Sequence, residues 1–488
     1  MIFSSYSFVL LFLPVVLIGF AITSRLPYRR APFIFLVIAS LIYCGYWRFA
    51  DLLPLAASII INFTLGRFIS STQKPLHKNL LLALGITFNL GLLIYFKYAS
   101  LLTETTNTLL GITWTVPAIV LPIAISFYTF QQIAYLFDAK NNLTHEYHFI
   151  DYCLFVTFFP QLIAGPIVHH ADMLPQFQNR KLQLNAPDFT VGISLFIFGL
   201  SKKVLIADEF SLMAAKAFTP ESSTLTFVAA WLGATAYAIQ IYFDFSGYSD
   251  MALGIARFFG IKLPLNFNSP YRATNIIEFW RRWHITLSTF LRDYLYFPLG
   301  GNRKGHARRY LNLFITMLLG GLWHGAAWVF MLWGGLHGLY LCINHAFHKL
   351  FPNRPTSALP YIIAARSITL LAVILAWVLF RADSLSQASD FFTAMFGLNG
   401  FALAHPFKSS RIILLILMIA LVTIMPNIQT MMRQYRPHHG RKLKWDGIPA
   451  LATWKWRPEP FWVIILVVLF TASILQMSRA GEFIYYRF

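Results

Sequence analysis

The stretch LLGGLWHGAAWVFMLWGGLHG (residues 318–338) is long, apolar and free of charged side chains, yet it carries His324 and His337. An ionisable group at membrane depth is costly, so an intramembrane histidine marks a candidate functional site. Another histidine, His284, lies upstream in EFWRRWHITLSTFLRDYLYFPLGGNRKG (residues 278–305). Two segments that each present a histidine, with a basic stretch between them, predict a site inside a membrane protein.

The composition of the whole chain indicates the same class of protein. Of its 488 residues, 57% are hydrophobic and 12% are charged, whereas an ordinary soluble domain is about 25% charged. Apolar runs near the roughly 20 residues that cross a bilayer recur along the chain. They lie near residues 5–24, 31–49, 52–69, 79–99, 116–137, 148–168, 188–207, 224–243, 310–332, 334–350, 359–381, 411–430 and 461–478.

These runs predict an all-α, polytopic membrane protein with about 11–13 transmembrane or re-entrant helices. Because the sequence has no internal repeat and no long soluble linker, we treat residues 1–488 as one integral membrane domain. Its catalytic core is expected at about residues 120–350, where polar residues are unusually frequent in apolar sequence. The buried acids Asp244 and Asp250 of that core are expected to pair with arginines, Arg257 for Asp250 and downstream arginines for Asp244.

The positive charge of the chain reports its topology. The cluster Arg25, Arg29 and Arg30 follows the first apolar run, so the positive-inside rule places it in the cytoplasm and Met1 on the periplasmic side. The formal charge of +20 sits in short loops that flank the apolar runs. There it meets anionic lipid headgroups, and we therefore expect membrane lipids as partners and no nucleic acid.

His324 is predicted to be a catalytic base. Its flanks are uncharged, and a desolvated imidazole stays neutral, the form that accepts a proton. Gly320, Gly321 and Gly325 allow another backbone or a substrate to approach. The alternative is a packing histidine. His337 would lie about 220° away on a continuous helix, and the cysteines match no ligand spacing, so no metal is expected.

The segment around His284 is too charged for lipid and is expected at the cytoplasmic interface. Its arginines Arg281, Arg282 and Arg292 are candidates for binding the phosphates of an acyl donor such as a coenzyme A thioester, because guanidinium groups bind phosphate bidentately. A belt of lipid-headgroup contacts is the alternative. Glu278 and Arg282 have the spacing of a helical ion pair.

Three blocks of this chain resemble the membrane-bound O-acyltransferase (MBOAT) family, in particular its bacterial polysaccharide branch, typified by the membrane subunit of the alginate O-acetylation system. They are IYFDFSGYSDMALGIA (241–256), the RRWH block and the GLWHG block. The resemblance also covers MIFSSYSFVLLFLPVVL (1–17), LPIAISFYTFQQIAYLFD (121–138) and FFPQLIAGPIVHHADMLPQF (158–177), and it extends over about residues 1–385.

The resemblance implies helices packed around a central funnel in the bacterial inner (plasma) membrane. The family's catalytic histidine corresponds to His324, and its second functional histidine corresponds to His284. The acyl donor implied is acetyl-CoA from the cytoplasm, a substrate and not a permanently bound cofactor. The acetyl group would cross the membrane to an exported polysaccharide such as alginate, through a separate periplasmic acetyltransferase partner protein.

Other functions are compatible with parts of this pattern. Within the same fold, the acceptor can be peptidoglycan, cellulose, a lipid, or a carrier as in D-alanylation of teichoic acids. A non-enzymatic transporter, whose histidines and acids shuttle protons, is a different class, and the RRWH and GLWHG pair argues against it. For the chemistry, we expect base-assisted transfer ahead of a covalent acyl-enzyme.

Overall fold

The computed structural model of the chain describes residues 1–117, 119–144, 148–179, 182–219, 225–353, 356–440, 443, 447–479, 481 and 483–484. Over these ranges the regular structure is helical, apart from one isolated bridge between Pro264 and His439. The chain divides into two compact units. Unit 1 comprises Met1–Phe196, Tyr248–Leu265 and Pro437–Gly440, and unit 2 comprises Ile197–Gly247, Asn266–Arg436 and Arg441–Phe488.

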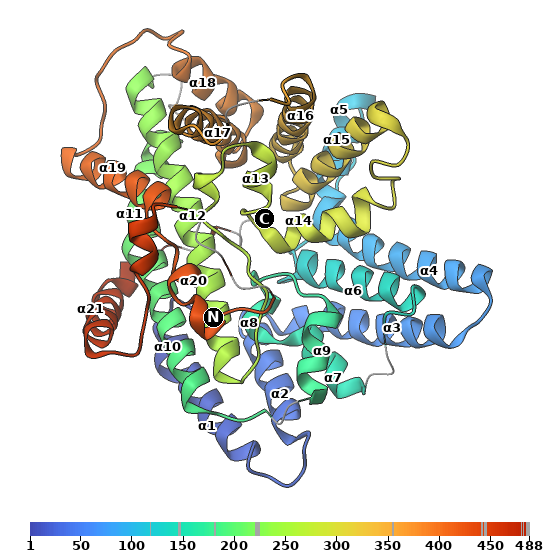
Figure 1. Cartoon of the computed structure of the whole chain (residues 1–488). Helices are drawn as coiled ribbons and strands as arrows, with labels where there is room; N and C mark the ends of the chain where they lie inside the picture. Colours follow the sequence, from blue (N-terminus) through green and yellow to red (C-terminus); the bar gives the residue numbers. More distant parts are fainter. Residues whose placement is uncertain are drawn as a thin grey trace. The chain divides into compact units, whose positions relative to one another are not determined.

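Unit 1 is built mainly from the N-terminal helices. Its core is the trio α3, α4 and α6, which pack on one another (Figure 1). Asn62 of α3 and Asn89 of α4 exchange side-chain hydrogen bonds of 2.6 and 3.1 Å, which satisfies two fully buried amides. The helices of this unit are α1 (Leu13–Thr23), α2 (Ala31–Gly45), α3 (Leu52–Ser71), α4 (Pro75–Leu93), α5 (Ala99–Leu110), α6 (Ile125–Lys140), α7 (Phe149–Thr157), α8 (Phe159–Leu162) and α9 (His170–Asn179).

Two helices, α10 (Ala186–Ser201) and α12 (Phe227–Phe258), contain residues of both units. The remaining helices belong to unit 2, which contains His284, His324 and the candidate arginines. They are α11 (Asp208–Ala217), α13 (Ile276–Trp280), α14 (Ile285–Leu291), α15 (Gly305–His324), α16 (Trp328–Leu350), α17 (Leu359–Arg381), α18 (Leu385–Met395), α19 (Ser409–Ile424), α20 (Ile428–Met431) and α21 (Pro460–Gln476).

Helices α15 and α16 of unit 2 pack closely against each other. Glycines at their interface permit this close approach. A Cβ atom added at Gly321 would lie 2.2 Å from the carbonyl oxygen of Phe330 and 2.9 Å from Cα of Gly334. A Cβ atom at Gly334 would lie 2.3 Å from the carbonyl oxygen of Met317. The backbones therefore touch where the two glycines face each other, as small residues allow in membrane helix pairs. This confirms the expectation that a glycine beside His324 admits another backbone.

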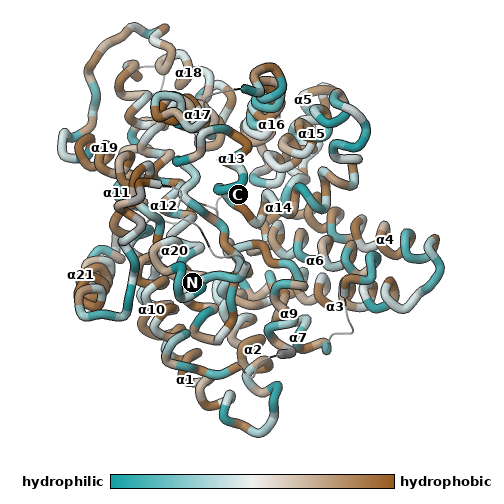
Figure 2. Tube along the Cα trace, in the orientation of Figure 1, coloured by the Kyte–Doolittle hydropathy of each residue, from teal (hydrophilic) through white to brown (hydrophobic). Residues whose placement is uncertain are grey.

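The apolar helices agree with the predicted class of fold. Four described helical segments are long and apolar enough to cross a membrane: Phe49–Ser71, Pro75–Leu110, Ala186–Ala217 and Leu359–Arg381. Four shorter apolar segments are Ser7–Thr23, Ala31–Gly45, Ser409–Ile424 and Pro460–Gln476. On α21 the side chains of Ile464 and Val468 are 64% and 61% exposed, and Figure 2 shows hydrophobic residues along this helix. Such a surface suits lipid and not water.

The prediction of an all-α, polytopic membrane protein is thus confirmed, whereas the number of spans stays a prediction. Several predicted runs are wrong in their extent: within the run near 116–137 the helix begins only at Ile125, and the runs near 148–168 and 411–430 are interrupted after Thr157 and Ile424. The run near residues 310–332 is broken, because α15 ends at His324 and α16 begins at Trp328. The backbone between them is extended at Gly325 (φ −162°) and Ala327 (φ −149°), so the chain reverses immediately after the histidine.

Candidate functional site

His324 is the last residue of α15 and is only 3% exposed. Aromatic rings enclose it: the ring centroids of Trp323, Trp333 and Phe380 lie 5.0, 5.1 and 5.2 Å from its imidazole. Trp333 meets it edge-on, with an interplanar angle of 90°. This setting is largely dry, which favours the neutral imidazole that the sequence predicted.

His284 links α13 to α14 and is fully buried. Its backbone is left-handed, with φ 42° and ψ 54°, a conformation that non-glycine residues rarely adopt and that often marks a functional position. The sharp turn aims the side chain inward, against the ring of Phe245 at 4.8 Å. Burial lowers the pKa of His284 to about 3, so this imidazole is neutral at physiological pH.

Asn266 fixes the tautomer of His284. Its Oδ1 atom lies 3.1 Å from Nδ1 of His284 and accepts hydrogen bonds from the Thr286 hydroxyl at 3.0 Å and the Thr286 backbone N–H at 3.4 Å. A backbone N–H can only donate, so the amide oxygen faces the histidine and Nδ1 must carry the proton. Nε2 of His284 therefore holds the lone pair, which can accept a proton or a hydrogen bond.

The imidazole rings of His284 and His324 lie close to each other. Their ring centroids are 6.3 Å apart, although they lie on different helices of unit 2 and far apart in the sequence. In the described part of the chain, no group of three or more His, Cys, Asp or Glu residues is arranged to hold a metal ion. The arrangement offers two buried imidazoles in a desolvated space, which suits proton transfer to and from a hydroxyl group.

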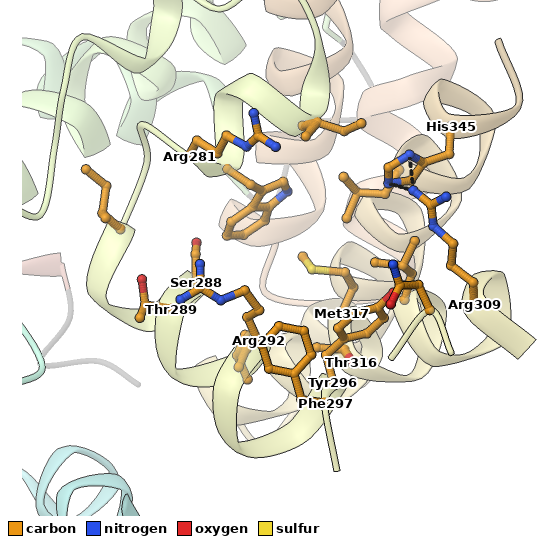
Figure 3. A pocket seen from close by; sticks show the side chains of 17 residues that line it. Arg281, Ser288, Thr289, Arg292, Tyr296, Phe297, Arg309, Thr316, Met317 and His345 are labelled. Carbon is orange, nitrogen blue, oxygen red and sulfur yellow. Dashed lines mark hydrogen bonds between the residues drawn. The ribbon is translucent and has the colours of Figure 1, made fainter. Parts of the chain in front are cut away.

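A basic pocket of about 600 Å³ opens beside α13, α14 and α15. Its cations are Arg281, Arg292 and Arg309, and Figure 3 shows Arg281 and Arg292 on one side of it and Arg309 with His345 on the other. Arg309 donates a 2.7 Å hydrogen bond to Nδ1 of His345. The lining also includes the polar residues Ser288, Thr289, Asn302 and Thr316. Three guanidinium groups with hydroxyl and amide groups form a surface that can bind phosphate.

The three arginines that the sequence predicted to bind phosphate do not all lie in this pocket. Arg281 and Arg292 line the pocket, and Arg292 also pairs with Asp293 at 2.7 Å. Arg282 does not line it. Its guanidinium donates to Glu278 Oε1 at 2.7 and 3.0 Å, the pair that the four-residue spacing predicted, although Arg282 lies just beyond the end of α13. Sequence reasoning missed Arg309 as a lining residue and Asn266 as the partner of His284, since only the fold brings them to the pocket and to the imidazole.

A smaller cavity of about 350 Å³ is lined in part by one of the aromatic residues around His324. Phe380, which contacts His324, is part of its wall, together with the polar residues Asp208, Gln240 and Asp383. Nearby, Nζ of Lys203 lies 2.8 Å from carboxylate oxygens of both Asp208 and Asp244. The prediction that Asp244 pairs with a downstream arginine is wrong, because an upstream lysine compensates this buried charge. Asp244 also accepts the backbone N–H of Ile484 at 2.9 Å.

Comparison with known proteins shows the family of this chain. The family model of the membrane-bound O-acyltransferase (MBOAT) family matches residues 40–386, so the chain belongs to this family and is an acyltransferase. It is 42% identical to the peptidoglycan O-acetyltransferase of Helicobacter pylori over 443 residues, 84% of this chain and 82% of that protein.

Two further relatives come from the same comparison. The chain is 39% identical to the probable alginate O-acetylase AlgI of Pseudomonas putida over 505 residues, covering 100% of both chains. It is 28% identical to the teichoic acid D-alanyltransferase of Bacillus subtilis over 267 residues, 52% of this chain and 65% of that protein. The three names denote transfer of an acetyl or D-alanyl group, to peptidoglycan, alginate and teichoic acid respectively.

Proposed function

We propose that this protein is an O-acetyltransferase of the bacterial inner membrane, which takes acetyl groups from cytoplasmic acetyl-CoA and delivers them across the membrane to an exported polysaccharide. The observation that carries the proposal is the contact between buried His284 and buried His324, with ring centroids 6.3 Å apart. These are the histidines of the RRWH and GLWHG motifs.

The basic pocket supports acetyl-CoA as the donor. Coenzyme A carries several phosphate charges, and Arg281, Arg292 and Arg309 bring three cations to one pocket of about 600 Å³. The basic residues from Arg303 to Arg309, just before and within the first turns of α15, support a cytoplasmic location of this side by the positive-inside rule. The N-terminus is then periplasmic, because the cluster at Arg25, Arg29 and Arg30 belongs to the cytoplasmic side as well.

The chemistry follows from the neutral imidazoles. His324 takes the proton of the acceptor hydroxyl, the oxygen attacks the thioester carbonyl, and a tetrahedral intermediate forms. When the carbon–sulfur bond breaks, the protonated imidazole returns the proton to the leaving thiolate, so protons and electrons balance. His284 supports this step, because the lone pair on its Nε2 can orient a nearby donor N–H or O–H group. No covalent acyl-enzyme is required.

The acceptor is an exported polysaccharide such as alginate, reached through a separate periplasmic acetyltransferase partner. The relative called alginate O-acetylase, aligned over 100% of both chains, supports this choice. Peptidoglycan is the second candidate, because the peptidoglycan O-acetyltransferase is 42% identical over 84% of this chain. The chemistry at His324 does not distinguish the two acceptors, because the periplasmic partner, and not His324, esterifies the sugar hydroxyl.

Labelled acetyl-CoA tests the donor and its side of entry. Inside-out membrane vesicles that contain the protein should incorporate acetyl label into alkali-labile esters, whereas sealed right-side-out vesicles should not, because coenzyme A does not cross a bilayer. Equal incorporation in both orientations would contradict cytoplasmic entry, and no incorporation in either would contradict acetyl-CoA as donor. Supplying de-esterified alginate or peptidoglycan, each with its periplasmic transferase, then separates the two acceptors.

A further inference from the structure

His337 is a third buried histidine of unit 2, and the chemistry above does not use it. It lies in α16 and is 0% exposed. The sequence suggested that His324 and His337 face different directions on a continuous helix. Because the chain reverses after His324, both imidazoles instead contact the same side chain, Trp333, with ring centroids 5.1 and 4.9 Å from it.

The protonation state of His337 follows from Trp280. The indole Nε1–H of Trp280 donates to Nδ1 of His337 at 3.3 Å, and an indole N–H can only donate. Nδ1 therefore holds the lone pair and Nε2 carries the proton. Within the described ranges, Nε2 has no hydrogen-bond partner. Protonating Nδ1 would remove the acceptor and bury a charge among aromatic rings, so His337 stays neutral and is unsuited to be a base.

Trp280 connects His337 to the basic pocket. It is the last residue of α13, it is 8% exposed, and it lines the pocket directly beside Arg281. Its ring packs on His337 at 5.1 Å and 82°, and on Trp333 at 5.9 Å and 65°. Since α13 has only five residues, it has few backbone hydrogen bonds of its own, and its position depends on contacts with its neighbours, α16 among them.

We propose that His337 is a positioning residue that holds the indole of Trp280 as a wall of the donor pocket and thereby sets the affinity for the acyl donor. This inference rests on the proposed donor role of the pocket. His337 acts through Trp280 and does not take part in proton transfer. Its removal should therefore affect donor binding more than the chemical step.

Two substitutions distinguish the hydrogen bond from simple packing. His337→Asn keeps an acceptor close to the Nδ1 position, whereas His337→Phe keeps an aromatic ring and loses the acceptor. In protein labelled with ¹⁵N-indole tryptophan, Trp280→Phe identifies the Trp280 N–H resonance among those of the 13 tryptophans. His337→Phe should shift this resonance towards that of an indole without a hydrogen bond, and His337→Asn should largely restore it.

Acetyl-CoA binding and steady-state kinetics test whether this hydrogen bond affects the donor. His337→Phe should weaken equilibrium binding of acetyl-CoA and raise its KM about tenfold, the effect of one lost buried hydrogen bond. The value of kcat should stay within about twofold, and His337→Asn should bind within about threefold of wild type. In the Trp280→Phe background, His337→Phe should have little further effect, because the donor of the hydrogen bond is already absent.

Several results would overturn the inference. An unmoved Trp280 resonance in His337→Phe would refute the hydrogen bond, and unchanged acetyl-CoA binding despite a shifted resonance would refute the link to the donor. A fall confined to kcat, or a changed pH profile in His337→Asn, would make His337 an acid or base. If wild-type protein does not bind acetyl-CoA, the proposal for the donor fails, and the role of His337 fails with it. If wild-type protein binds acetyl-CoA but the variants do not behave as expected, only the role of His337 is refuted.

Discussion

The glycine contact between α15 and α16 yields a sharp prediction, because the neighbouring residue supplies its control. Gly334→Ala places a Cβ atom 2.3 Å from the carbonyl oxygen of Met317 and 3.0 Å from Cα of Gly321. Carbon atoms in contact lie about 3.5–4.0 Å apart, so the helices must separate by roughly 1 Å. Overpacking of this kind costs about 1–3 kcal/mol.

The separation should also impair activity. Trp333 precedes Gly334 and packs on His324 at 5.1 Å, so moving α16 displaces one wall of the catalytic site. A misplacement of about 1 Å can reduce a rate about a hundredfold. We therefore expect acetyl transfer to fall at least about tenfold and the thermal unfolding midpoint in detergent to fall by on the order of 5 °C.

Gly335→Ala is the matched control. Its Cβ atom would lie 3.4 Å from Cδ1 of Leu318, an ordinary contact, and alanine favours a helix by roughly 1 kcal/mol over glycine. This variant should be as stable as wild type or more so, with activity within about twofold. If Gly334→Ala matches Gly335→Ala in both thermal unfolding and acetyl transfer, the account of this helix contact is wrong.

Further predictions concern the surroundings of His284 and the pocket. Asn266→Ala should reduce kcat about 10–100-fold with normal insertion, because it removes the amide oxygen that holds the proton on Nδ1 of His284; transfer assays on equal amounts of membrane-inserted protein measure this. The depressed pKa of His284 means that unfolded chains bind a proton below about pH 6.5 and folded chains do not until about pH 3. Its contribution should lower stability as pH falls through that window and stay constant above it, and thermal unfolding of His284→Asn should show a shallower acid loss than wild type. Arg292→Ala should raise the KM for acetyl-CoA by about tenfold, whereas Arg282→Ala, which breaks the pair with Glu278, should leave it within about twofold; kinetics at several donor concentrations separate them.

The sequence predicted the class of fold and the two histidines because both depend on local signals. Apolar runs report membrane helices whatever their neighbours are, and an imidazole in uncharged sequence is conspicuous. The break after His324 was not predicted, since GLWHGAAW is apolar throughout and contains no proline. The structure shows the reversal directly, because α16 packs back on α15 where Gly334 faces Gly321.

The details of the site depend on contacts between distant residues, which a single sequence does not reveal. Arg281, Arg282 and Arg292 look alike in the sequence, yet Glu278 engages one and the pocket receives the other two. Lys203 became the partner of Asp244 because their helices pack together. The role of Asn266 depends on a turn that brings it beside His284, and nothing in its neighbouring residues indicates this.

The central claim is that His324 is the base for acetyl transfer. The most direct measurement is acetyl ester formed from labelled acetyl-CoA by membranes that contain His324→Ala, compared with wild type at equal amounts of folded, inserted protein. His405→Ala, which changes an exposed histidine, is the control and should behave as wild type. The account predicts that His324→Ala loses at least about a hundredfold of the transfer rate. A rate within a few-fold of wild type would contradict it.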